Sequence, residues 1–85
     1  MAPILMYATA ICPFCVQAER LLRSRGVADI AKVRVDLEPA LRQEMMQKTG
    51  RRTVPQIYIG EVHVGGYDDL VALDRAGKLD PLLAA

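Results

Sequence analysis

The sequence has 85 residues, of which 52% are hydrophobic and 25% are charged, and its formal net charge is +1. This length supports one hydrophobic core, so we expect a single domain over residues 1–85. The composition excludes a disordered chain, and the small net charge without a basic face argues against nucleic-acid binding.

The first half of the chain alternates between strand and helix patterns. Residues 4–8 form a short apolar run typical of a strand covered on both faces. From Pro13 to Arg25 the apolar residues recur at helical spacing; proline suits the first turn, and Gly26 suits the end. A half-exposed strand is predicted over 32–36, and a second helix over 38–50.

The second half predicts a β-hairpin and a last helix. Two short strands, 56–59 and 62–64, flank Gly60-Glu61, a pair suited to a type II′ turn. A helix follows from Tyr67 and ends near Gly77, and the remaining apolar tail packs on the domain or frays. The predicted order is β-α-β-α-β-β-α, an α/β fold whose four-stranded mixed sheet is flanked by three helices.

Both cysteines of the chain lie in Cys12-Pro13-Phe14-Cys15, where a strand pattern gives way to a helix. One helical turn between two sulfurs allows them to form a disulfide, so the motif indicates dithiol–disulfide exchange. Cys12 falls at the helix N-cap, where unpaired N–H groups and the helix dipole favour a thiolate and lower its pKa. Cys15 is one turn further in and more buried. We therefore expect Cys12 to attack and Cys15 to resolve.

Two other interpretations of the cysteine pair remain open at this point. The sulfurs could be buried as small hydrophobic groups, or they could bind zinc. A structural zinc site needs four ligands, and beyond the cysteines the chain offers only His63 and scattered carboxylates, so we expect no metal. The first residues resemble neither a signal peptide nor a membrane helix, which predicts a cytosolic protein without membrane contact.

Three motifs resemble the glutaredoxins, and in particular the small bacterial dithiol members of that family. They are Cys12-Pro13-Phe14-Cys15, Thr53-Val54-Pro55 and residues 65–69, Gly-Gly-Tyr-Asp-Asp. With the order of strands and helices, they cover nearly the whole chain. The resemblance implies a thioredoxin fold and an enzyme that uses glutathione to reduce glutathione mixed disulfides and protein disulfides. Thioredoxin itself is less similar, because the chain has no Trp beside its cysteines.

The resemblance also implies a glutathione site beside Cys12. Pro55 matches a cis-proline, and a cis bond there would leave the backbone of Val54 free to pair with glutathione. By the same resemblance, Arg42 binds the glycine carboxylate of glutathione, and the γ-glutamyl end of glutathione contacts the start of the last helix. The substrate-binding residues that it implies are Phe14, Arg42, Thr53, Val54, Pro55, Gly66, Tyr67 and Asp68.

By resemblance, the electrons come from NADPH through glutathione reductase, and the partners are glutathionylated or disulfide-bonded proteins. A monomer is expected. Two positions depart from the family pattern: Thr9 stands where many relatives have Lys, and Phe14 where Tyr is common. One positive charge near Cys12 is therefore missing, and Arg42, Arg51 or Arg52 is expected to compensate.

Two rival functions share this fold. One is an iron-sulfur carrier, in which two subunits and two glutathiones hold a cluster through Cys12. Pro13 argues against it, because by resemblance a smaller residue at that position is more typical of cluster-holding relatives. The other is a redoxin that thioredoxin reductase reduces, which the choice of reductase would distinguish.

Overall fold

The computed structural model describes all of residues 1–85, and its centre is a four-stranded sheet in the order β2-β1-β3-β4. The strands are β1 (Ile4–Ala8), β2 (Ala31–Arg34), β3 (Gln56–Ile59) and β4 (Val62–Gly65). β1 runs parallel to β2 and antiparallel to β3, and β3 pairs antiparallel with β4. The mixed sheet predicted from the sequence is confirmed.

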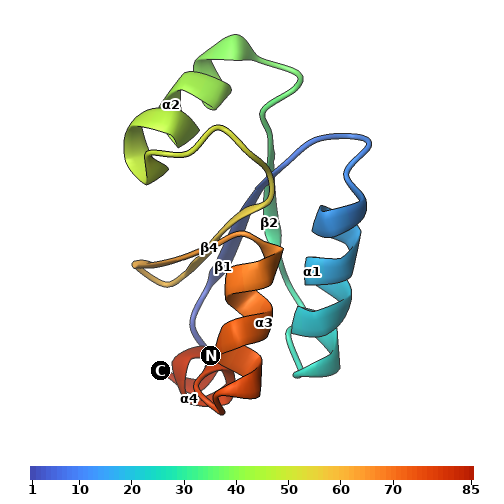
Figure 1. Cartoon of the computed structure of the whole chain (residues 1–85), viewed down its shortest axis with the longest axis vertical. Helices are drawn as coiled ribbons and strands as arrows, with labels where there is room; N and C mark the ends of the chain where they lie inside the picture. Colours follow the sequence, from blue (N-terminus) through green and yellow to red (C-terminus); the bar gives the residue numbers. More distant parts are fainter.

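Helices cover both faces of the sheet (Figure 1). They are α1 (Pro13–Ser24), α2 (Pro39–Thr49), α3 (Tyr67–Arg75) and α4 (Leu79–Ala84). α1, α3 and α4 pack on one face, and α2 lies on the other (Figure 1). A bidentate ion pair between Arg25 and Asp74, with N–O distances of 2.7 and 2.8 Å, ties α1 to α3. These are the two helices whose first turns form the site described below.

The alternation of side chains along β1 divides the core into two layers. Ile4, Met6 and Ala8 face α1, α3 and α4 in a cluster of 12 buried residues. Tyr7 faces α2 in a smaller cluster of four buried residues, where it meets Tyr58. Because β1 is buried on both faces, the continuous apolar run in the sequence matches its central position.

The hairpin turn follows the sequence prediction, whereas β2 is displaced. Gly60 has a φ of 60° and is the only residue of the two-residue turn with a positive φ, as a type II′ turn requires. The strand expected over 32–36 instead spans Ala31–Arg34. The ladder ends at the pair formed by Ala8 and Arg34, and Asp36 turns back to bind the Arg34 guanidinium.

The apolar tail forms a fourth helix, α4, where the sequence predicted only packing or fraying. Leu79 and Leu83 are buried in the larger cluster, and the Leu83 carbonyl accepts a hydrogen bond from Ala2 at 2.9 Å. The tail therefore completes the core beneath β1. None of the four helices has the length and hydrophobicity needed to cross a membrane.

Candidate active site

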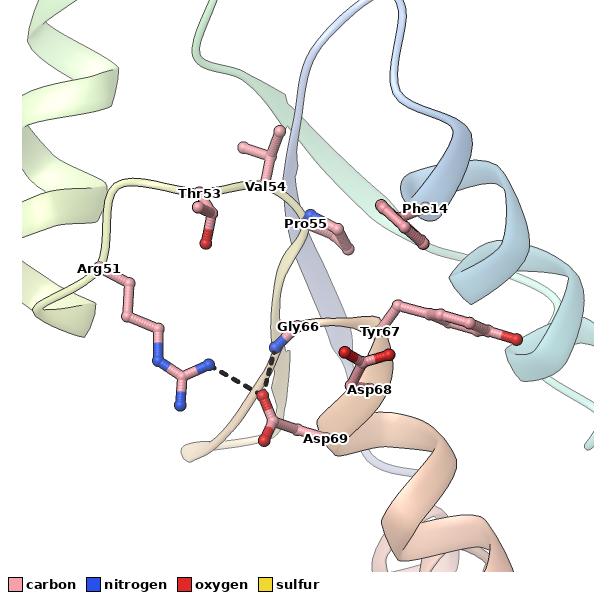
Figure 2. A pocket seen from close by; sticks show the side chains of 9 residues that line it. All are labelled: Phe14, Arg51, Thr53, Val54, Pro55, Gly66, Tyr67, Asp68 and Asp69. Carbon is pink, nitrogen blue, oxygen red and sulfur yellow. Dashed lines mark hydrogen bonds and ion pairs between the residues drawn. The ribbon is translucent and has the colours of Figure 1, made fainter.

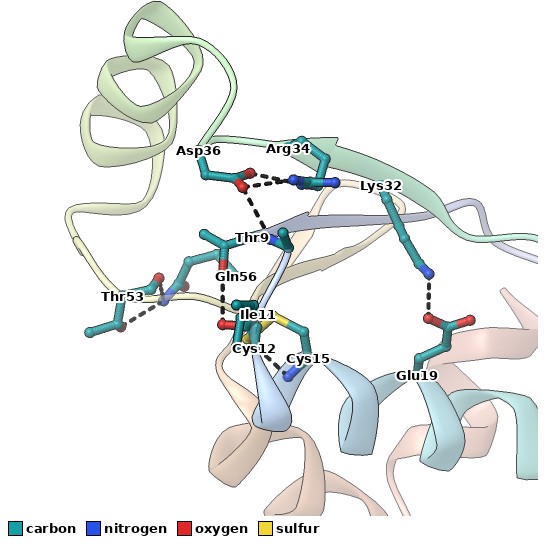
Figure 3. The surroundings of a disulfide bond; sticks show 11 residues. Thr9, Ile11, Cys12, Cys15, Glu19, Lys32, Arg34, Asp36, Thr53 and Gln56 are labelled. Carbon is teal, nitrogen blue, oxygen red and sulfur yellow. Dashed lines mark hydrogen bonds and ion pairs between the residues drawn. A yellow bond between two sulfur atoms is a disulfide. The ribbon is translucent and has the colours of Figure 1, made fainter.

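The two cysteines form a disulfide at the start of α1 (Figure 3). Cys12 is the N-cap residue, and its Sγ accepts a hydrogen bond from the Cys15 N–H at 3.1 Å. Pro13 occupies the first helical position, where a backbone N–H would have no acceptor within the helix, so its absence costs no hydrogen bond. Cys15 is only 6% exposed and belongs to the core, whereas Cys12 is half-buried. The sequence therefore placed both sulfurs correctly relative to the helix and to solvent.

The loop before Cys12 is held by Asp36 (Figure 3). The Asp36 carboxylate accepts the Ala10 N–H at 3.2 Å and both guanidinium donors of Arg34 at 2.7 Å. The hydrogen bonds from Arg34 hold the pKa of Asp36 far below its usual range. Thr9, which replaces the expected Lys, donates to the Ile11 carbonyl at 3.4 Å.

The basic residues on the β2 side of the disulfide are already paired. Arg34 binds Asp36, and Lys32 binds Glu19 on α1 (Figure 3). The hydrogen bond from Lys32, and a further one from Arg23, lower the pKa of Glu19. No unpaired cation on this side of the disulfide replaces the positive charge of the Lys that many relatives have in place of Thr9. The structure also gathers no cluster of three or more His, Cys, Asp and Glu side chains.

A groove of about 310 Å³ opens on the other side of the first turn of α1 (Figure 2). Three segments line it: the first turn of α1, the loop before β3 and the start of α3. The lining residues are Phe14, Arg51, Thr53, Val54, Pro55, Gly66, Tyr67, Asp68 and Asp69. Seven of the eight residues that the resemblance assigned to glutathione therefore share one cavity, and Arg42 is the exception.

The Val54–Pro55 peptide bond is cis, as the resemblance implied. Pro55 is buried beneath the groove, and Val54 is half-buried at its wall. Neither the N–H nor the C=O of Val54 has a hydrogen-bond partner within the chain. Because backbone groups of this kind seek partners, they can pair with an extended ligand.

The first turn of α3 forms the opposite wall of the groove (Figure 2). Asp69 caps it, because its Oδ2 accepts the Gly66 N–H at 2.9 Å and the Arg51 Nη1 at 2.8 Å. The hydrogen bond from Arg51, followed by that from Gly66, lowers the pKa of Asp69. The N–H groups of Tyr67 and Asp68 have no partner in the chain, and they present the positive end of the helix to the groove.

Two aromatic side chains contact each other between the N-termini of α1 and α3. The rings of Phe14 and Tyr67 stack with centroids 6.2 Å apart and an interplanar angle of 25°. Phe14 is 56% exposed despite this contact, so its free face is available to a ligand. Phe14 and Tyr67 therefore form one aromatic wall of the groove.

Arg42 does not line the groove, because its guanidinium donates to the Arg52 carbonyl at 3.1 Å. The cation that lines the groove is Arg51, paired with Asp69. The sequence interpretation did not include Arg51 among the glutathione-binding residues and assigned Asp69 no individual role. Asp69 lies three residues after the helix N-cap, a position at which an acidic residue often caps the helix, and this signal could have predicted its role.

His63 lies on β4 and contacts a buried side chain of the neighbouring strand β3. It is half-buried, and its Nε2 lies 2.8 Å from Oε1 of Gln56, whose side chain is fully buried. Burial lowers the pKa of His63, and the charge of Arg51 lowers it further against a smaller opposing effect of Asp69. The alternating pattern of β4 could not show that a polar partner lies on the neighbouring strand.

Comparison with known proteins places this site in a family. A model of the family described as Glutaredoxin matches residues 4–64. The chain belongs to the glutaredoxin family. It is 55% identical over 85 residues to a glutaredoxin of Pseudomonas aeruginosa, with full coverage of both chains. It is 48% identical over 83 residues to glutaredoxin 3 of Escherichia coli K12, covering 98% of this chain and 99% of that protein.

A solved glutaredoxin has the same fold. The crystal structure of a buckwheat glutaredoxin–glutathione complex aligns with a TM-score of 0.88 and 32% identity, covering 98% of this chain and 77% of that one. Glutaredoxins are thiol–disulfide oxidoreductases that use glutathione as reductant. The chain is thus a glutathione-dependent oxidoreductase whose redox centre is the Cys-Pro-Phe-Cys motif.

Proposed function

We propose that Cys12 is the nucleophile for glutathione mixed disulfides. Its thiolate attacks the glutathione sulfur, the substrate leaves as a thiolate that takes up a proton, and Cys12 becomes glutathionylated. A second glutathione thiolate then attacks the glutathione sulfur bound to Cys12, which releases glutathione disulfide and restores the Cys12 thiolate. The N-cap position supports this role, because the Cys15 N–H and the helix dipole stabilise an anionic sulfur.

For protein disulfides we propose that both cysteines act. Cys12 attacks one substrate sulfur and forms a mixed disulfide, and Cys15 then attacks the Cys12 sulfur. The substrate leaves as a dithiol, and the product is the Cys12–Cys15 disulfide, the form present in the structure. Two molecules of glutathione return it to the dithiol. The burial of Cys15 supports its role as the resolving group, because a substrate reaches Cys12 first.

The groove beside α1 is proposed to bind the glutathionyl part of the substrate. The free backbone groups of Val54 pair with the peptide, with Thr53 and Pro55 shaping the wall on either side. The γ-glutamyl carboxylate meets the free backbone N–H groups of Tyr67 and Asp68 in the first turn of α3, and the Asp68 side chain meets the ammonium. Phe14 and Tyr67 close the groove with their rings. The unpaired N–H groups and the exposed Asp68 carboxylate support this orientation.

A guanidinium beside the groove is proposed to bind the glycine carboxylate. The sequence resemblance assigned this role to Arg42, whereas Arg51 is the arginine that lines the cavity. Replacing each in turn by Ala decides between them. If Arg51 binds the carboxylate, Arg51→Ala raises KM for a glutathionylated peptide and Arg42→Ala does not; the reverse result assigns the role to Arg42.

We further propose that the protein works as a monomer in the cytosol, where NADPH and glutathione reductase recycle glutathione disulfide. Its substrates are glutathionylated and disulfide-bonded proteins, without nucleic acid, membrane or metal. Residues 1–85 act as a single glutaredoxin domain. The free exposure of Phe14 and the half-exposed Cys12 support access by a folded protein partner.

The position of an N-cap sulfur next to a peptide-sized groove is the observation that carries this proposal. A coupled assay that follows NADPH, with glutathione, glutathione reductase and a glutathionylated peptide, tests it. Asp68→Asn removes a groove charge and should raise KM for the peptide. Asp80→Asn, an exposed carboxylate on α4, is the matched control and should leave KM unchanged. Equal KM values for Asp68→Asn and the parent protein would contradict the assignment of the groove.

A further inference from the structure

A buried amide lies behind the groove. The side chain of Gln56 has no exposed area, yet every polar atom in it is bonded. Its Nε2 donates to the Thr53 carbonyl at 3.1 Å and lies 3.4 Å from the Thr53 hydroxyl (Figure 3). Its Oε1 lies 2.8 Å from Nε2 of His63 on β4. Gln56 therefore connects the loop of the groove to the edge strand of the sheet.

The direction of these hydrogen bonds follows from the carbonyl of Thr53. A carbonyl can only accept, so the amide nitrogen of Gln56 must face it, and the amide oxygen must face His63. His63 must then carry its proton on Nε2. The His63 ring is held in this orientation by stacking on Tyr58, with centroids 5.0 Å apart. Donation thus runs in one direction, from His63 to Gln56 to Thr53.

Arg42 and Asp69 hold the loop at Arg52 and Arg51, but no hydrogen bond other than those from Gln56 holds Thr53 or Val54. Val54 makes no hydrogen bond of its own, and Thr53 is exposed. Arg51 N–H binds the Thr49 hydroxyl at 3.0 Å, which fixes the end of α2 rather than the groove wall. The contact with Gln56 is therefore what anchors the Thr53 carbonyl, and with it the peptide plane that presents the Val54 N–H.

We propose that His63 is a positioning residue of the reductase reaction, which acts through Gln56 to orient the Thr53–Val54 backbone that receives glutathione. This inference rests on the proposed glutathione groove. His63 touches no reacting atom, and its role is to keep the Gln56 amide in one orientation. Without a donor at position 63, the buried Oε1 loses its partner, and the amide can rotate away from the Thr53 carbonyl.

Burial lowers the pKa of His63, the charge of Arg51 lowers it further and Asp69 opposes this, so the neutral ring is favoured at pH 7. Arg51 faces it from the groove loop, Asp69 faces it from α3, and Lys48 of α2 lies over the Tyr58 ring, 4.6 Å from its centroid. A neutral ring with its proton on Nε2 is the form that donates to Gln56. The geometry requires no change of protonation during the reaction.

Two substitutions at one position test the inference. His63→Phe keeps the aromatic stacking on Tyr58 and removes the donor, whereas His63→Gln restores an N–H donor. With a glutathionylated peptide, His63→Phe should raise KM by roughly 2- to 10-fold, the equivalent of one hydrogen bond, without lowering kcat. His63→Gln should return KM toward the parent value. The rate of Cys12 alkylation by iodoacetamide, which needs no groove, should be unchanged in both variants.

Asp68→Asn, measured beside these variants, separates the inference from the groove assignment. An unchanged KM in His63→Phe, with a raised KM in Asp68→Asn, overturns the role of His63 and leaves the groove intact. An unchanged KM in both overturns the groove and the inference together. A slower alkylation of Cys12 in His63→Phe also overturns it, because His63 would then act on the sulfur.

A second variant keeps the test decisive if His63→Phe does not fold. Gln56→Met preserves the length of the buried side chain and removes both hydrogen bonds. It should raise KM as His63→Phe does, and the backbone amide resonances of Thr53 and Val54 should shift in its NMR spectrum. Unshifted resonances with a parent-like KM overturn the inference.

Discussion

Asp69→Ala should destabilise the protein through the first turn of α3. In the parent protein one carboxylate oxygen binds both the Gly66 N–H and the Arg51 guanidinium. Loss of a capping side chain costs about 1 kcal/mol in the free energy of unfolding. The ion pair adds less, about 0 to 1 kcal/mol, because its side chains are 47% and 43% exposed. Together the loss is about 1 to 2 kcal/mol.

This loss translates into a shift of the melting temperature. For a chain of 85 residues the entropy of unfolding is about 0.18 kcal/mol/K, so the expected fall in Tm is about 6 to 11 °C. Thermal unfolding of the oxidised protein, followed by circular dichroism, measures it. Asp69→Asn is the matched variant, because its amide oxygen still accepts from Gly66 while the charge is gone. The Tm of Asp69→Asn should fall by less than that of Asp69→Ala.

The effect should also depend on pH. Hydrogen bonds from Arg51 and Gly66 lower the pKa of Asp69 in the folded chain below its unfolded value. A lowered carboxyl pKa adds stability above the unfolded pKa, and this stability is lost as the pH falls through the folded pKa. The difference in Tm between the parent and Asp69→Ala should thus narrow below about pH 4. An equal Tm for the two proteins at pH 7 would refute the capping argument.

Three further predictions follow from the cysteines, the glycines and His63. Cys12→Ser should abolish both reductions, whereas Cys15→Ser should keep deglutathionylation and lose turnover of protein disulfides; the opposite pattern would reverse the assigned roles. Gly65→Ala should cost about 2 to 4 kcal/mol in urea unfolding, because its φ is 111° and a Cβ would collide with the Asp69 carboxylate. Gly77→Ala, with a φ of 71° and open space around it, should cost only about 1 kcal/mol, and equal losses would contradict this. Because burial and Arg51 lower the pKa of His63, the unfolded chain gains a proton below about pH 6.5 that the folded chain does not bind, so the free energy of unfolding should fall there. His63→Gln should lack this part of the fall in the free energy of unfolding. Parallel curves of unfolding free energy against pH for the parent protein and His63→Gln would count against the prediction.

Local patterns in the sequence were enough to predict the redox centre and the sheet. Pro13 after Cys12 marked the helix start, and the alternating hairpin with Gly60 marked the last two strands. The cis bond at Pro55 came from family resemblance, because sequence alone cannot distinguish the two isomers. The tail that became α4 contains Pro81 within six residues, too short a segment for its periodicity to predict a helix.

The placement of charged and polar side chains around the groove could not be predicted in the same way. Arg42, Arg51 and Arg52 all lie near the loop in the sequence, and only the path of the backbone decides that Arg51 reaches Asp69. The bond between Gln56 and His63 depends on cross-strand register, which shifts by a bulge at Ile57 and Tyr58. Such contacts arise from tertiary geometry rather than from periodicity.

The stacked pair of Phe14 and Tyr67 gives this protein an optical reporter of its own. The chain has three tyrosines and no tryptophan, so its ultraviolet fluorescence arises from tyrosine without tryptophan background. Tyr7 and Tyr58 pack against each other on the α2 side, with ring centroids 6.5 Å apart, whereas Tyr67 alone lines the groove. The difference spectrum between the parent and Tyr67→Phe therefore isolates one ring at the active site, and ligand occupancy can be followed without an added label.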